Sequence, residues 1–393
     1  MRKTSRTLSV LAFVAGTTML AGAANAQRTT LSADGRWQGV SEIVGQTATS
    51  SVVAPAGGGG GDPIYIPTPG KYAGTVGLRM DYGAAGAFVC SGTLINSNTI
   101  VTAAHCVSDG TADRPLTTTA YFHNGPDGPT VYNPATSGSV AVNVIKTTVH
   151  ASYSGSVVDE NDIAILTLGS AAPSFAKAIQ LSEISDLTGL DHTIAGYGAR
   201  STNGGGTGTL AVSNANTGRL RDADNRFDWR FGDADFEGYW DGAFGPQGID
   251  NVWMSDFDNG TAFRDNSCNL AGFESGTSPE AAAIFSKAVF SSSKYCDLGR
   301  GAREGIGAGG DSGTGYFIDG KLVAVHSFAL WYRNDESANR FGQFKGAVSV
   351  DFHRAFINAN VPEPATWAMM IAGFGLAGAA VRRSKARPAV TFA

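Results

Sequence analysis

Charged side chains are scarce in this chain, since Asp, Glu, Lys and Arg together make up only 16% of its 393 residues. Helical bundles need abundant Lys and Glu, so this scarcity, together with 52 glycines, argues against a bundle and favours a turn-rich β protein. Histidine is limited to six residues, none of them in a His-Glu-x-x-His pattern, which leaves zinc-protease chemistry without support. We predict no metal and no cofactor.

Acidic residues outnumber basic ones in the body of the chain. The formal net charge is -5, but seven of the Lys and Arg residues lie close to the two ends. Without residues 1–26 and 362–393, which also hold Glu363, 22 basic residues stand against 33 acidic ones. An acidic protein repels phosphate backbones, so we expect no nucleic-acid partner.

The N-terminus has the three parts of a secretory signal. A basic start precedes a short apolar run, Leu8–Ala24, and Ala24-Asn25-Ala26 forms a cleavage site before Gln27. The shortness of the run favours a cleaved signal peptide over residues 1–26 rather than a permanent membrane anchor. Export permits disulfides, and the four cysteines are an even number.

The C-terminus carries a second apolar segment. Pro362-Glu363-Pro364 precedes the run Trp367–Val381, which a cluster of Arg and Lys follows. Fifteen apolar residues are few for crossing a bilayer, but the basic flank is typical of a membrane-stop signal. This order resembles the PEP-CTERM sorting signal of Gram-negative bacteria. The resemblance implies an exosortase-type processing enzyme, transient membrane association and delivery to the cell surface or exterior; the alternative is a simple C-terminal anchor.

Composition divides the rest of the chain. Residues 27–70, rich in Gly and Pro, read as a leader or linker that packs no core. From Thr75 onward, short β-branched and aromatic runs alternate with turn residues, which predicts an antiparallel sandwich or barrel. The pair Asp319-Gly320 predicts a hairpin. Residues 201–267 lack apolar periodicity and read as a surface insertion, whose aromatic residues we expect to pack locally rather than to form a binding face.

Three short motifs carry the chemistry, in the order His, Asp, Ser. His105 lies in Thr-Ala-Ala-His-Cys after an expected strand, Asp162 leads directly into another, and Ser312 lies in Gly-Asp-Ser-Gly. A serine hydroxyl needs an imidazole to take its proton, and a carboxylate must orient that imidazole. The N–H groups of Gly310 and Ser312 can then stabilise an oxyanion. Each motif alone is weak, but the conjunction predicts nucleophilic catalysis.

The conjunction resembles the trypsin/chymotrypsin family over residues 72–200 and 263–358. That resemblance implies an all-β fold of two antiparallel six-stranded β-barrels with a C-terminal helix, over residues 71–190 and 191–358, before the sorting signal at 359–393. It implies disulfides Cys90–Cys106 and Cys268–Cys296. It also implies a serine endopeptidase that acts on protein or peptide substrates. The rival hypotheses are a catalytically inactive surface or matrix protein on the same fold, and an esterase, disfavoured because no Gly-x-Ser-x-Gly surrounds Ser312.

The resemblance also implies a substrate-binding set: Ile306, Ser327, Phe328 and Ala329. Ile306 stands where a pocket specific for basic residues has Asp, which indicates small or apolar side chains rather than Lys or Arg at the cleavage site. Activation in the family frees an Ile-Val-Gly-Gly terminus that pairs with the Asp beside the serine, here Asp311. Ile43-Val44-Gly45 matches part of that pattern, but Glu42 precedes it; otherwise Asp311 has another partner.

One acidic run remains. Asp256-Phe257-Asp258-Asn259-Gly260 is similar to the start of a calcium loop but lacks its regular spacing and distal Glu. We therefore expect a solvated turn there. The histidines other than His105 are expected to lie at the surface or to serve in packing.

Overall fold

A computed structural model describes residues 28–41, 44–47, 63–111, 114–125, 128–200, 217–270, 293–332 and 341–361, together with positions 374, 376 and 382. The predicted signal peptide, Glu42 and Ile43, and nearly all of the sorting segment lie outside these residues. Within the described part, no helix is long and apolar enough to cross a membrane.

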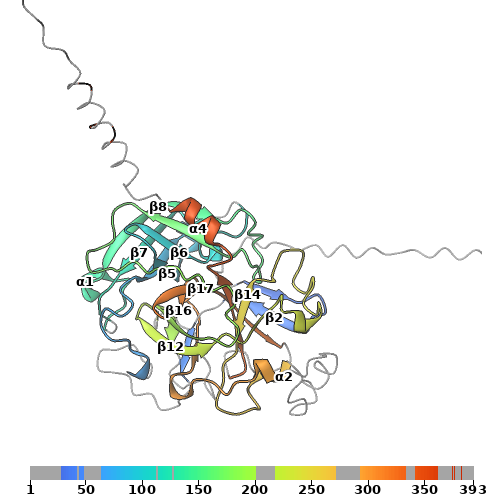
Figure 1. Cartoon of the computed structure of the whole chain (residues 1–393). Helices are drawn as coiled ribbons and strands as arrows, with labels where there is room; N and C mark the ends of the chain where they lie inside the picture. Colours follow the sequence, from blue (N-terminus) through green and yellow to red (C-terminus); the bar gives the residue numbers. More distant parts are fainter. Residues whose placement is uncertain are drawn as a thin grey trace, which may run out of the picture.

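The first half of the chain closes into a six-stranded antiparallel barrel (Figure 1). Its strand order is β4-β5-β6-β9-β8-β7, and β7 closes the barrel by pairing with β4. Alternating apolar residues such as Val76, Leu78 and Met80 point into its core. The strands are β4 (Thr75–Asp81), β5 (Ala87–Leu94), β6 (Thr99–Thr102), β7 (Thr117–Phe122), β8 (Val140–Val149) and β9 (Ala164–Leu168).

The second half forms an antiparallel sheet of nine strands, which is open among the described residues. Its main path runs β12-β10-β16-β17-β18-β14-β13, and β2 joins the path by pairing with β17. The strands are β1 (Thr29–Leu31), β2 (Trp37–Val40), β10 (Asp191–Gly196), β12 (Arg221–Arg226), β13 (Trp229–Arg230), β14 (Val252–Ser255), β16 (Gly315–Ile318), β17 (Lys321–Tyr332) and β18 (Phe344–Ser349). The all-β class and the first barrel are therefore confirmed, while the second unit is a larger sheet than the expected six strands.

Small elements complete the fold. The three-stranded sheet β11-β3-β15 joins Ala199–Arg200, Val44–Thr47 and Gly305–Ile306. The helices are α1 (Pro134–Ser137), α2 (Asn266–Leu270) and α4 (Arg354–Asn360), of which α4 is the expected C-terminal helix. Asp319 and Gly320 both have positive φ, 50° and 73°, and turn β16 into β17 as predicted.

Two organisational predictions are wrong. Residues 28–41 belong to the second sheet instead of an unstructured leader, and Trp37 of β2 is 2% exposed in an aromatic core. Residues 217–267 are not a surface insertion, because they supply β12, β13 and β14. The aromatic residues of this segment pack rather than form a binding face, but not locally as expected: Trp229, Phe231 and Trp240 lie in a core shared with Trp37 and Phe344.

Candidate active site

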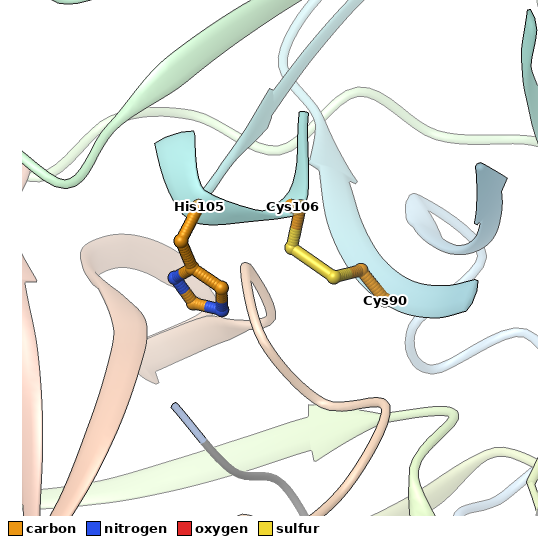
Figure 2. A group of neighbouring side chains, drawn as sticks. All are labelled: Cys90, His105 and Cys106. Atoms are coloured by element: carbon orange, nitrogen blue, oxygen red, sulfur yellow. A yellow bond between two sulfur atoms is a disulfide. The ribbon is translucent and has the colours of Figure 1, made fainter. Parts of the chain in front are cut away.

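The first barrel supplies the imidazole and the carboxylate. β6 ends at Thr102, and the short 3-10 helix Ala104–Cys106 places His105 at the barrel rim, where the Cys90–Cys106 disulfide ties the turn to β5 (Figure 2). Asp162 lies just before β9, the neighbour of β6. Its Oδ2 lies 2.7 Å from His105 Nδ1, and its Oδ1 accepts the His105 backbone N–H at 2.8 Å. The carboxylate thus fixes both the ring and the backbone of His105.

The second sheet supplies the serine. The loop before β16 carries Ser312, whose Oγ hydrogen-bonds to His105 Nε2. This loop packs tightly on the first barrel: Gly313 has a φ of +81°, and a Cβ there would lie 2.0 Å from Thr102 Oγ1. Only glycine fits such an approach. The structure therefore joins His105, Asp162 and Ser312 across two separate sheets.

Asp162 is nearly inaccessible, with its side chain 1% exposed. Burial raises the pKa of its carboxyl, but the His105 imidazole and hydrogen bonds from His105 and Ser327 outweigh this and hold that pKa below its usual value. The carboxylate therefore stays ionised beside the imidazole. It is suited to stabilising a positive charge that forms on His105 during a reaction.

Sequence reasoning missed one residue that holds the serine loop. Ser91, on β5, lies in none of the three sequence motifs, yet its N–H donates to the Ser312 carbonyl at 2.8 Å and its hydroxyl to the Gly310 carbonyl at 2.8 Å. The same hydroxyl oxygen accepts the Tyr197 N–H at 3.0 Å. Its place beside Cys90, whose partner is Cys106, was the signal in the sequence that it lies near the site.

The predicted oxyanion donors lie on either side of Asp311 in the serine loop. In the stretches that the structure covers, neither the Gly310 N–H nor the Ser312 N–H donates to a protein acceptor. Between them, Asp311 turns inward: its Oδ1 accepts the Gly198 N–H at 2.6 Å, and its Oδ2 accepts the Ala308 N–H at 3.2 Å. Burial raises the pKa of the Asp311 carboxyl to about 7, against smaller opposing effects from the Gly198 N–H and Lys345.

The four predicted substrate-binding residues lie in different settings. Ser327 donates its hydroxyl to Asp162 Oδ2, so its side chain serves the carboxylate. Along the β17 edge that carries β16 and β2, the stretch Ser327–Phe328 is paired with neither strand, but Ala329 pairs with Val40 of β2. Ile306 is buried with Phe257 and Phe341, and its backbone pairs with Gln46. Ile43, which could free a terminus for Asp311, lies outside the described residues.

Both expected disulfides are present, Cys90–Cys106 and Cys268–Cys296. The expectation of a solvated turn at Asp256–Gly260 is wrong for its acidic residues, because Asp256 is 1% exposed and Asp258 is 3% exposed. Two of the remaining histidines, His192 and His326, are buried and hydrogen-bonded to Ser255 and Tyr316, which fits a packing role.

Two family models match parts of this chain. The trypsin family model matches residues 68–228, a span that ends before Ser312, and the PEP-CTERM protein-sorting motif matches residues 360–384. Trypsin zeta of Drosophila erecta is 34% identical over 114 residues, which are 28% of this chain and 37% of that protein. Trypsin eta of Drosophila erecta is 30% identical over 150 residues, 37% of this chain and 53% of that protein. The chain thus spans about a third to a half of these relatives.

Two solved structures align over most of their length. One is described as HL collagenase, with 16% identity and a TM-score of 0.46, covering 75% of this chain and 96% of that one. The other is neuropsin, a serine protease expressed in the limbic system of mouse brain, with 14% identity and a TM-score of 0.46. That alignment covers 76% of this chain and 98% of neuropsin.

Proposed function

We propose that this chain, whose residues 68–228 match the trypsin family model and whose residues 360–384 match the PEP-CTERM sorting motif, is an exported serine endopeptidase. One observation carries the proposal: the His105 ring bridges Asp162 and Ser312, although the three residues come from two separate sheets. The sorting motif and the two disulfides support export to the surface of a Gram-negative bacterium, with an exosortase-type enzyme as the processing partner.

The mechanism follows from the hydrogen bonds of the three side chains. His105 Nε2 takes the Ser312 proton as Oγ attacks the peptide carbonyl, and Asp162 stabilises the resulting imidazolium through Nδ1. His105 then gives that proton to the leaving amine, which breaks the C–N bond and leaves an acyl-enzyme. A water molecule, deprotonated by His105, hydrolyses the ester and restores Ser312.

The oxyanion of each tetrahedral intermediate would be held by the N–H groups of Gly310 and Ser312. Both groups are available, and the buried Asp311 between them holds the loop through Gly198 and Ala308. A donor of this kind contributes about 3–4 kcal/mol to the transition state. The substrate backbone would pair as a further strand with the β17 edge at Ser327–Ala329, where it would have to displace Val40 of β2 from Ala329.

Covalent labelling tests the proposal directly. The secreted chain is treated with an organophosphonate probe, which phosphonylates only an activated serine. We expect labelling of the wild type and none of Ser312→Ala, with peptide hydrolysis lost in the same variant. If a folded wild-type sample is neither labelled nor active, the chain is instead an inactive surface protein on this fold.

A further inference from the structure

An acidic cluster lies buried in the second half of the molecule, outside the catalytic site. Asp256 and Asp258 follow β14, and Asp265 precedes α2. A carboxylate oxygen from each lies within 4.8 Å of the others. The three residues are 1%, 3% and 2% exposed. Three carboxylates so close together, and so far from water, repel one another strongly unless something compensates their charge.

A fourth buried carboxylate, that of Glu304, lies beside this cluster. Glu304 is 1% exposed, and its Oε1 has no hydrogen-bond partner; the same holds for Asp258 Oδ1. Glu304 Oε2 accepts the Arg300 N–H at 2.6 Å and, like Asp258, packs against Gly299, which places this carboxylate beside the cluster. Buried carboxylate oxygens are almost always satisfied, so two neighbouring carboxylates that each have an oxygen without a partner indicate a missing ligand.

Positive side chains do not fill that role. Among the residues that the structure describes, no Lys or Arg forms an ion pair with Asp256, Asp258 or Glu304. The nearby Arg226 and Arg300 both pair with Asp297 instead. A bound cation would supply the positive charge that no described Lys or Arg supplies to Asp256, Asp258 or Glu304.

We propose that Asp256, Asp258, Asp265 and Glu304 bind a Ca²⁺ ion. All the ligands are oxygens, which hard cations prefer, and both nearby cysteines are committed to a disulfide. Oxygens on opposite sides of Ca²⁺ lie roughly 5 Å apart, which matches the span of the cluster. Mg²⁺ retains several waters and fits a dry cage poorly.

The proposed ion would hold together segments that are distant in sequence. Asp265 accepts N–H groups from Cys268 and Asp297, on either side of the Cys268–Cys296 disulfide. Asn225 donates to the carbonyls of Asp256 and Gly305, and Gly305 directly precedes Ile306. The cation would therefore brace the chain that leads into the Ser312 loop, a role separate from the peptidase chemistry.

The test measures Ca²⁺ binding by the full secreted chain carrying Ser312→Ala, so that self-digestion does not interfere. After the protein is stripped with a chelator, calorimetry with CaCl₂ should show one site, and Tm should rise by roughly 5 °C at saturation. MgCl₂ should raise Tm by much less. Absence of binding heat and of a Tm shift in a sample that remains folded overturns the proposal.

Asp258→Asn separates a metal site from a merely acidic core. Because it removes one repelling charge, this variant should have a higher Tm than the stripped wild type and should lose the Ca²⁺-dependent rise. Glu304→Gln serves if Asp258→Asn does not fold. Asp241→Asn, at an exposed residue, should behave as wild type. Unchanged Ca²⁺ affinity in both cluster variants contradicts the site.

A separate observation concerns a buried cation. Lys345 on β18 is 2% exposed and lies opposite Ala329 of β17. Residues paired directly across two strands point their side chains to the same face, so Lys345 faces the side to which Ala329 points. Its charge acts on Asp311, the residue next to Ser312. The ammonium group is thus near the catalytic loop, while the expected pocket position Ile306 bears no charge.

We infer that Lys345 makes the substrate pocket select an acidic side chain, Glu or Asp, on the N-terminal side of the cleaved bond. This inference rests on the proposed peptidase function. A substrate carboxylate would form a charge-assisted hydrogen bond with the ammonium in a dry site. It revises the expectation of small or apolar side chains. The chain itself has Glu42 directly before Ile43, the expected activation terminus.

Fluorogenic peptides that differ only in the residue before the cleaved bond test this inference. Wild type should prefer Glu or Asp over Leu by roughly 100-fold in kcat/KM. Lys345→Met should remove that preference, and Lys345→Arg should keep it. N-terminal sequencing should find Ile43 as the first residue of the matured wild type, and an uncut Glu42–Ile43 bond in Lys345→Met.

Organophosphonate labelling separates the two possible failures. If Ser312 is not labelled, the peptidase proposal fails. If it is labelled but acidic peptides are not preferred, or if Lys345→Met keeps the same preference, only the role of Lys345 is wrong.

Discussion

The two halves of the molecule differ in the kinds of side chain that they bury. The first barrel is closed, each of its strands has two neighbours, and its core cluster is made of apolar side chains. The second sheet is open among the described residues and takes two strands from residues 28–41. It also encloses charged groups, including Lys345, Asp311 and the four carboxylates of the acidic cluster.

The first barrel therefore acts as a stable scaffold, whereas the stability of the second sheet depends on the solution conditions. Apolar burial stabilises the first barrel at any pH and without added ions. The charged groups of the second sheet destabilise it unless a counter-charge, a proton or a hydrogen bond compensates them. Stability in the second half should therefore respond to pH, to cations and to the segment that covers it, and more strongly than the apolar core of the first barrel.

The largest expected effect is on catalysis, which needs residues from both halves. Asp162→Asn should leave the fold intact but lower kcat about 10⁴-fold, because the amide no longer holds His105 in the required tautomer. Asp159→Asn is the matched control, since Asp159 is also buried but accepts hydrogen bonds from Ser154 and Asn161. It should lower Tm while kcat stays within about tenfold of wild type. Similar kcat losses in both variants would remove Asp162 from the mechanism.

The pH dependence of stability sharpens the contrast between the halves. Burial raises the pKa of the Asp311 carboxyl from its ordinary value of 3.8 to about 7, so the folded state favours its protonated form. Its contribution is fully present at pH values below about 4 and is lost as the pH rises to about 7. In Asp311→Asn, the Oδ1 atom can still accept the Gly198 N–H.

Urea denaturation of wild type and Asp311→Asn at pH 4 and pH 8 measures this loss, both in the Ser312→Ala background. The free energy of unfolding of the variant relative to wild type should rise by up to about 4 kcal/mol between the two pH values. A constant difference between the two proteins would show that Asp311 is not costly to ionise.

The same contrast explains what the sequence could predict. His105, Asp162 and Ser312 were identifiable because each lies in a short motif next to a strand, and because Cys90 and Cys106 bracket the His loop. Such signals are local, and the first barrel is built from neighbouring strands. The hairpin at Asp319-Gly320 was identifiable for the same reason.

The strands of the second sheet could not be predicted from local sequence patterns, because residues distant in the chain determine which of its side chains are buried. β12 contains Arg221, Asp222 and Asn225, all buried, so it shows no apolar alternation. The sequence around Asp256 and Asp258 resembles an exposed turn, but both residues are buried near Glu304, which lies far along the chain. The four residues of β2 gain a structural role only by pairing with β17, far along the chain. Periodicity cannot reveal partners of this kind.

The smallest expected effect concerns β2 itself. Val40 pairs with Ala329, the position where a substrate backbone is proposed to pair, and both cannot occupy that edge at once. The hairpin is anchored on the other half too, because the Arg28 guanidinium donates to the Ser108 and Gly155 carbonyls of the first barrel. It therefore bridges the two halves over the site, where Ser312 is 2% exposed.

Val40→Pro removes the N–H of Val40 and weakens the β2–β17 ladder by about 1–1.5 kcal/mol. We expect organophosphonate labelling of Ser312 to become about tenfold faster in unprocessed chains. Leu31→Ala, on the outer strand of the same hairpin and 44% exposed, should label at the wild-type rate. Equal rates in all three proteins would mean that β2 is a permanent part of the sheet, and that substrates bind only along Ser327 and Phe328.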